Sequence, residues 1–117
     1  MKEIDVKQIY ARIEYHLFDA QSSYESAIQN YGKFRDQWID EKVDYEKLFA
    51  ETVRNIASTG EKVTIIKEIA KTKCIDEYRK MLHTETRYKY YKKLCEGLNE
   101  RIQTIKYLGR AKHSNFN

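Results

Sequence analysis

Lysines and tyrosines are interleaved in the second half of the chain, between residues 88 and 93. The three lysines are Lys89, Lys92 and Lys93, and the three tyrosines are Tyr88, Tyr90 and Tyr91. Ammonium groups contact phosphates and aromatic rings stack on bases, so this combination is typical of proteins that bind single-stranded nucleic acid. Helical spacing places Tyr88 and Tyr91 on an apolar stripe and turns Tyr90 elsewhere. We therefore expect Tyr90 to be the ring available for stacking.

A basic ridge extends this pattern along the predicted second helix. Lys73, Lys80, Arg87 and Arg101 repeat every seven residues, interrupted only by Leu94. Such a ridge has two interpretations, because it can meet a polyanion or pair with carboxylates of an adjacent helix. The acidic residues available for the second interpretation are Asp40, Asp44 and Glu51.

No arrangement of residues indicates catalysis or a bound cofactor. The histidines, His16, His83 and His113, lie on three different segments, and none belongs to a hydrolase or zinc motif. Cys74 and Cys95 are 21 residues apart on one predicted helix, which separates them by roughly 30 Å. We expect two small buried residues on a seam that cannot bridge each other, with an inter-subunit disulfide or a metal site as the alternatives. We expect no cofactor and no enzymatic activity.

The elements that must position these residues are long helices. The chain has no proline, only four glycines and 34% charged residues, which favours an all-α fold. From Val6 to Leu48, apolar residues follow one another at alternating spacings of three and four, so they form one stripe that another helix must bury. The predicted core or oligomerisation seam consists of Tyr10, Leu17, Tyr24, Tyr31, Phe34, Trp38, Tyr45, Leu98, Ile102 and Ile105.

The helix boundaries follow from local signals. We predict a first helical arm over residues 3–57, a bend at 58–61, a second arm over 62–109 and a frayed tail at 110–117. The bend has the capping-box spacing Ser58-x-x-Glu61, and Gly109 is placed as a C-terminal stop. The seam keeps its phase across Gly32, which favours an extended antiparallel hairpin over a kink at Gly32 and a compact bundle.

Charge is distributed unequally along this single predicted domain. Residues 1–57 contain 8 Lys/Arg and 11 Asp/Glu, whereas residues 58–117 contain 14 and 7. The second arm is therefore the part suited to an anionic partner, and the acidic first arm can attract it within or between subunits. The sequence has no apolar run of ~18 residues and no apolar signal region, so we expect a cytoplasmic protein with no membrane contact.

The order of these parts resembles small helical-hairpin proteins of tailed phages and, more distantly, the UvsY family of recombination mediators. The resemblance covers most of the chain: Tyr24-x-x-Ala27 in a long first helix, the Ser/Thr-Gly bend before Lys62-Val63, the Tyr90-Tyr91 pair, and a final helix ending near Lys106-Tyr-Leu-Gly. It implies a non-catalytic oligomer that binds single-stranded DNA and helps to load a recombinase in place of a single-strand-binding protein. The residues offered for DNA contact, from charge and position, are Lys67, Lys71, Lys73, Lys80, Arg87, Lys89, Tyr90, Lys92 and Lys93.

Two other functions are compatible with the same features. The chain can be a helical adaptor or inhibitor that docks on a host or phage protein, its charges serving solubility and internal pairing. It can also be a purely structural coiled coil. The phage-type interpretation places the protein in the host cytoplasm, as a homo-oligomer with single-stranded DNA and a recombinase or single-strand-binding protein as partners.

Overall fold

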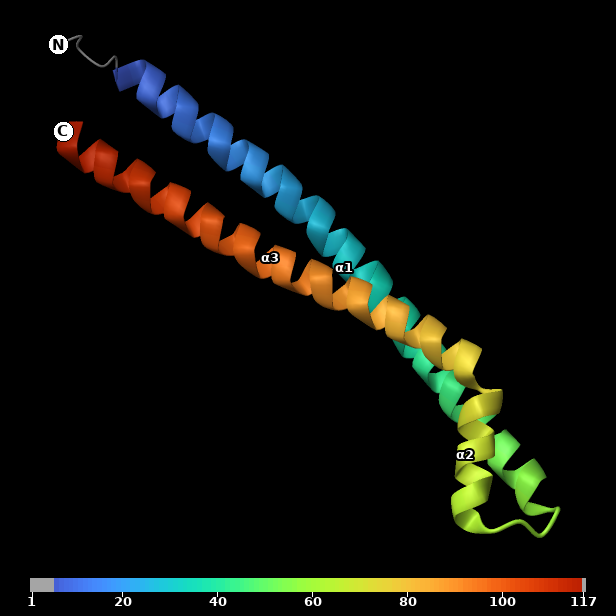
Figure 1. The fold of residues 1–117 in the computed structure, drawn as a ribbon. Helices are drawn as coiled ribbons and strands as arrows, with labels where there is room; N and C mark the ends of the chain where they lie inside the picture. Colours follow the sequence, from blue (N-terminus) through green and yellow to red (C-terminus); the bar gives the residue numbers. More distant parts are fainter. Residues whose placement is uncertain (1–5, 117) are drawn as a thin grey trace. The chain divides into compact units, whose positions relative to one another are not determined.

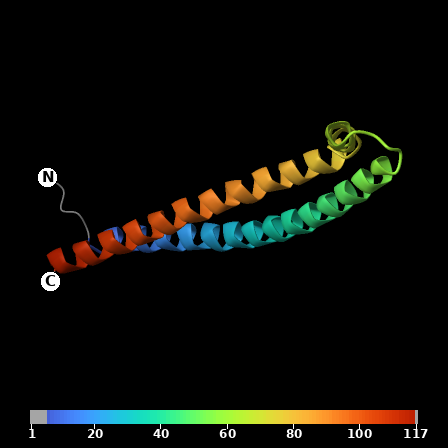
Figure 2. The ribbon, with the colours of Figure 1, turned by 90° about the horizontal axis from the view of Figure 1, so that it is seen from below.

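The computed structural model describes residues 6–116 of the chain, and every regular element in that range is a helix (Figure 1). Helix α1 spans Val6–Ala57, α2 spans Val63–Lys73 and α3 spans Ile75–Phe116. After α1 the chain reverses direction, so that α2 returns beside the end of α1 (Figure 2). The prediction of an all-α helical hairpin is confirmed.

Contacts divide the chain into two compact units. Unit 1 combines Met1–Tyr31 with Tyr90–Asn117, and in its described part the beginning of α1 lies antiparallel to the end of α3. Unit 2 is Gly32–Lys89, which contains the end of α1, all of α2 and the beginning of α3. Unit 1 is thus a pair of helical segments, whereas unit 2 has three.

The predicted seam of α1 is its packing face. Every position at alternating spacings of three and four from Tyr10 to Thr52 is buried or half-buried, including the one polar interruption, Glu41. On α3, Leu98 and Ile105 are half-buried and Ile102 is buried. The seam side chains therefore pack within the chain, and assembly of several chains through this seam stays a prediction.

Unit 2 contains the hydrophobic cluster of the structure. Ile56 from α1 packs with Ile66 and Ala70 from α2, and Phe49, Val53 and Ile69 cover this group. Cys74 is 1% exposed, and its thiol lies 3.6 Å from the hydroxyl of Thr52. Because α2 adds a third apolar surface, this end of the hairpin buries whole side chains rather than one narrow stripe.

The bend between α1 and α2 differs from the predicted capping box. The Ser58 and Thr59 hydroxyls donate hydrogen bonds to the carbonyls of Asn55 and Ile56, each at 2.6 Å. These bonds occupy backbone groups at the end of α1, whereas α2 begins after Lys62 with no side-chain cap. Gly60 has a φ of +83°, a left-handed conformation in which a Cβ would be strained. Ser58 and Thr59 therefore help to end the first helix, and the predicted role of Ser58-x-x-Glu61 in starting the second one is wrong.

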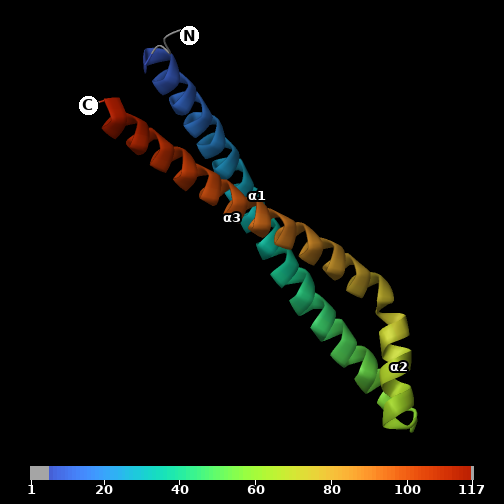
Figure 3. The same cartoon turned by 60° about the vertical axis from the view of Figure 1, so that its left-hand side comes forward.

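The second arm is not one helix from 62 to 109, as predicted. It is interrupted at Cys74, where α2 and α3 meet at an angle (Figure 3). Lys71 and Lys73 occupy the last turn of α2, and Asp76 and Glu77 the first turn of α3. The two lysines stabilise the C-terminal end of α2 and the two carboxylates stabilise the N-terminal end of α3, because each charge is opposite to the helix dipole at that end.

The predicted stop at Gly109 is also wrong, because α3 continues to Phe116. A Cβ on Gly109 would lie 3.4 Å from the Cγ2 atom of Ile13 on α1. Gly109 thus permits a close approach of two helices in unit 1 instead of ending one. Gly32, the predicted position of an alternative kink, lies within α1 without interrupting the helix.

Candidate nucleic-acid interface

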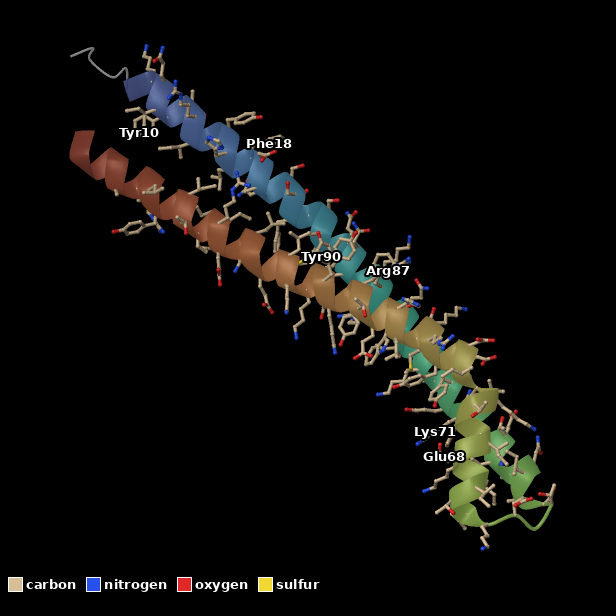
Figure 4. All side chains as sticks on the ribbon, viewed as in Figure 1. Tyr10, Phe18, Glu68, Lys71, Arg87 and Tyr90 are labelled. Atoms are coloured by element: carbon tan, nitrogen blue, oxygen red, sulfur yellow. The ribbon has the colours of Figure 1, made fainter. Side chains whose placement is uncertain are left out.

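All nine residues predicted to contact nucleic acid have exposed side chains, and the two units share them. Unit 2 contains Lys67, Lys71, Lys73, Lys80, Arg87 and Lys89. Unit 1 contains Tyr90, Lys92 and Lys93. Figure 4 labels Lys71 and Arg87 of unit 2 and Tyr90 of unit 1. Each unit therefore presents its own cations to solvent.

The short helix α2 contributes three lysines. Lys71 Nζ lies 3.6 Å from a carboxylate oxygen of Glu68, an exposed ion pair within one helix turn. Lys67 and Lys73 form no ion pair with any residue that the structure describes. An exposed ion pair stabilises by only ~0.5 kcal/mol, so Lys71 also remains able to contact a phosphate.

The beginning of α3 contributes two cations with partners inside the protein. The Arg87 guanidinium lies 5.7 Å from the ring centroid of Phe34, a cation–π contact with the first arm. Lys89 Nζ donates a hydrogen bond to Glu85 at 2.7 Å, and this bond, together with the carboxylate charge, raises the pKa of Lys89. Lys89 therefore keeps its positive charge, but that charge is already paired.

The three acidic residues expected to pair with the basic ridge, Asp40, Asp44 and Glu51, do not neutralise it. Between residues 6 and 116, no ion pair joins Asp40, Asp44 or Glu51 to any of the nine predicted residues. Lys80 of the ridge forms no ion pair in this range. Arg101 is the one member of the ridge with an ion-pair partner among the described residues, and that partner is Asp19. The ridge is therefore not a flank salt-bridged to Asp40, Asp44 and Glu51.

The tyrosines of the site differ in exposure as their helical spacing predicts. Tyr88 is half-buried and stacks on Trp38, with ring centroids 5.0 Å apart. Tyr90 is 60% exposed and meets the half-buried Tyr91 edge-on at 5.1 Å. Lys92 and Lys93 follow directly, and neither has an ion-pair partner among the described side chains. Tyr90 is thus an accessible ring in contact with Tyr91, with Lys93 one helix turn further along and Lys89 and Lys92 nearby in the sequence.

Sequence reasoning missed other exposed groups of unit 1. Tyr107 is 66% exposed, next to Lys106. Arg101, which was predicted in the basic ridge but not among the DNA contacts, pairs with Asp19 across the two helices at 3.9 Å. Lys106 and Arg110 line an apolar groove. The signal that could have found them is the run of three basic and no acidic residues over 101–111.

Two polar atoms of the seam, Trp38 Nε1 and Glu41 Oε2, are buried without a hydrogen-bond partner among the described residues. The other carboxylate oxygen of Glu41 accepts a hydrogen bond from Gln37 at 2.9 Å. Close by in unit 2, burial raises the pKa of Tyr45, and the neighbouring Cys74 and Tyr78 raise it further. Buried polar groups in a seam favour one register of the packed helices and lower stability when they lack a hydrogen bond. Trp38 and Glu41 are the two seam residues with such groups.

Both cysteines are free thiols. Burial, and then the charge of Glu96, raises the pKa of Cys95, which lowers its thiolate fraction and its reactivity. Within the described residues no three His, Cys, Asp or Glu side chains gather as metal ligands. His113 lies outside the described side chains.

Comparison of the chain with protein-family models, with curated proteins and with solved structures gives no match. Across the described residues, no helix combines the length and the apolar character that crossing a membrane requires. What the chain does must therefore be argued from its own residues.

Proposed function

We propose that this chain is a non-catalytic accessory protein of phage-type DNA recombination or replication, which binds single-stranded DNA as a homo-oligomer. A recombinase or a single-strand-binding protein would be its further partner, in the host cytoplasm. The resemblance to UvsY-type mediators supports the biological role. The side chains of the second arm support the binding chemistry.

One observation carries the proposal: five of the lysines predicted to contact DNA are exposed and have no ion-pair partner among the described residues. They are Lys67, Lys73, Lys80, Lys92 and Lys93. Unpaired ammonium groups in solvent bind phosphates at little desolvation cost, and DNA binding releases the counterions condensed on those phosphates. The exposed ring of Tyr90 beside Lys92 and Lys93 adds a surface on which a base can stack.

The test replaces three of these lysines and measures binding by fluorescence anisotropy with a labelled single-stranded oligonucleotide. The variant Lys67→Gln/Lys73→Gln/Lys80→Gln removes three unpaired charges without removing an ion pair. We expect an affinity about tenfold lower or weaker still, and a salt dependence reduced by roughly 2 in the slope of log K against log salt.

The matched control is Lys33→Gln/Lys42→Gln/Lys47→Gln, which makes the same change in net charge on the acidic first arm. Its affinity should stay within about threefold of the unmodified protein, because those lysines are outside the proposed surface. Equal losses in both triple variants would reduce the effect to net charge alone.

The adaptor interpretation makes the opposite prediction in the same experiment. An adaptor that binds only protein shows no oligonucleotide binding at ~50 mM salt, with or without the lysines. Lys89 is a poor choice for this comparison, because it is hydrogen-bonded to Glu85 and its replacement also changes helix stability.

A further inference from the structure

An apolar groove of about 590 Å³ opens in unit 1, between the beginning of α1 and the end of α3. Its α1 side is formed by Tyr10, Ile13 and Leu17, and Ile105 lies on the α3 side. All four side chains are only half-buried. In Figure 4, Tyr10 lies on the side of α1 that faces α3. The groove is thus an incompletely covered part of the seam.

The α1 side and the α3 side of the groove, called its two banks below, carry opposite charges. Lys106 and Arg110 line it on α3. On α1, Tyr10, Glu14 and Phe18 follow at spacings of four, so Glu14 and Phe18 continue the helix surface beside the groove. Glu14, Lys106 and Arg110 have no ion-pair partner among the described residues.

The charge separation extends beyond these side chains. Residues 13–31 contain three acidic residues and no Lys or Arg, and residues 101–111 contain three basic residues and no Asp or Glu. One of each, Asp19 and Arg101, pair with each other within unit 1. This leaves Glu14 and Glu25 on α1, and Lys106 and Arg110 on α3, without an ion-pair partner among the described residues. A face with one acidic and one basic bank is complementary to a copy of itself rotated by a two-fold axis, since each acidic bank then meets a basic one.

Phe18 adds an exposed aromatic side chain to this surface, since its side chain is 72% exposed. Phe18 follows Glu14 by one helix turn and is not part of the groove lining. An apolar ring in water beside an incompletely covered apolar groove gives each copy both parts of a self-complementary contact.

From these observations we infer that a second copy of this chain docks on the groove of unit 1 as a two-fold symmetric dimer. Phe18 of each copy enters the groove of the other, and Glu14 of each copy meets Lys106 or Arg110 of the other. This inference deepens the oligomeric part of the proposed function and rests on it. It is independent of the DNA contacts.

Light scattering of the full chain without DNA tests the interface through two single charge reversals. In Glu14→Lys or Lys106→Glu alone, both contacts of a homodimer become repulsive, so each variant should run at monomer mass. In a mixed dimer of the two variants, position 14 of each chain again faces the opposite charge at position 106 of the other. An equal mixture should therefore return to dimer mass.

Phe18→Asp should also give monomer mass with unchanged helicity in circular dichroism, because Phe18 is too exposed to hold the fold. Val63→Asp is the matched control, since Val63 is 67% exposed in unit 2 and this variant should keep the dimer mass. A mass that is the same in all variants and in the mixture overturns the inference, as does monomer mass in the unmodified protein.

The outcomes separate this inference from the proposed function. If the chain forms the dimer but binds no oligonucleotide, the dimer inference stands and the proposed DNA binding is overturned. If the chain binds oligonucleotide with a salt-dependent affinity, but replacement of Phe18 and the charge reversals leave its mass unchanged, only the dimer inference is overturned. Recovery of mass only after addition of an unrelated acidic helical peptide would assign the groove to another protein and overturn the self-docking inference.

Discussion

Unit 2 and unit 1 contain helices of the same chain but bury very different side chains. The buried residues of unit 2 are Ile56, Ile66, Ala70, Cys74, Met81 and Thr84. In the described part of unit 1 they are Ala20, Ala27 and Ile102, two of them alanines. Packing two helical segments covers one stripe on each, whereas α2 gives unit 2 a third surface. Stability is therefore concentrated in unit 2, and unit 1 has apolar surface left for partners.

This contrast gives the interruption at Cys74 a structural role. By ending α2 there, the chain can direct Ile66 and Ala70 onto the end of α1. The hydrogen bonds from Cys74 N–H to the Ala70 carbonyl and from Tyr78 N–H to the Cys74 carbonyl continue across the interruption. The second arm thus gains a packed core without leaving these backbone groups unsatisfied.

The largest predicted effect comes from truncation in the core of unit 2. Ile66→Ala should lower the free energy of unfolding by about 3 kcal/mol, because Ile66 is 6% exposed and a cavity would remain. Ile28→Ala is the counterpart in unit 1, where Ile28 is 43% exposed, and should cost less than about 1 kcal/mol. Urea denaturation followed by circular dichroism measures both. Equal losses would contradict the concentration of stability in unit 2.

A second prediction concerns Trp38, which is half-buried in the seam of unit 2. Trp38→Ala should lower the free energy of unfolding by about 2 kcal/mol through loss of the stack on Tyr88. Trp38→Phe keeps a ring and removes the unpartnered Nε1 donor, so its cost should stay below about 1 kcal/mol. The same denaturation experiment compares the two. A Phe variant as unstable as the Ala variant would show that Nε1 has a partner in solution.

Gly60 gives a third, smaller prediction at the bend of unit 2. Gly60→Ala should lower the free energy of unfolding by about 1 kcal/mol, because Ala is strained at a φ of +83°. Thermal melting measures this cost. Gly60→Asn is the control, since Asn adopts left-handed backbone more readily and should lose less. An Ala variant with unchanged melting temperature would contradict the left-handed bend.

The smallest effects are expected at two glycines inside helices, one in each unit. An added Cβ at Gly32 or Gly97 meets no atom within 4 Å among the described residues. Gly32→Ala and Gly97→Ala should each raise the free energy of unfolding by about 0.5–1 kcal/mol through helix propensity. Thermal melting of both variants sharpens the comparison. A loss in only one of them would locate a partner helix that approaches that glycine closely.

The helix-forming pattern of this chain was predictable from sequence, since the spacing of three and four is a direct consequence of helix geometry. It predicted the buried face of α1 as far as Leu48, and the end of α1 at Ala57 falls where the first arm was expected to end. The interruption at Cys74 was not predicted, because Cys74, Met81 and Tyr88 keep a spacing of seven across it. Two helix ends at this point were indicated by the local charges, which are Lys71 and Lys73 before Cys74 and Asp76 and Glu77 after it. The unbroken apolar spacing favoured one continuous helix instead.

The candidate site was predictable in its exposure but only partly in its pairing. Lysines on a charged helix face are expected in solvent, and the Lys71–Glu68 and Lys89–Glu85 pairs follow from spacings of three and four. The contact of Arg87 with Phe34 joins different helices, so it depends on how the helices pack. For the same reason, sequence alone could not decide whether Asp40, Asp44 and Glu51 neutralise the ridge.

The salt dependence of binding to a labelled single-stranded oligonucleotide tests the proposed phosphate contacts directly. Each phosphate contact contributes ~0.7 to the slope of log K against log salt, so contacts by the five unpaired lysines predict a slope of about −3.5 between ~50 and ~200 mM NaCl. No binding at ~50 mM NaCl, or a slope near zero, would contradict binding of single-stranded DNA through these lysines.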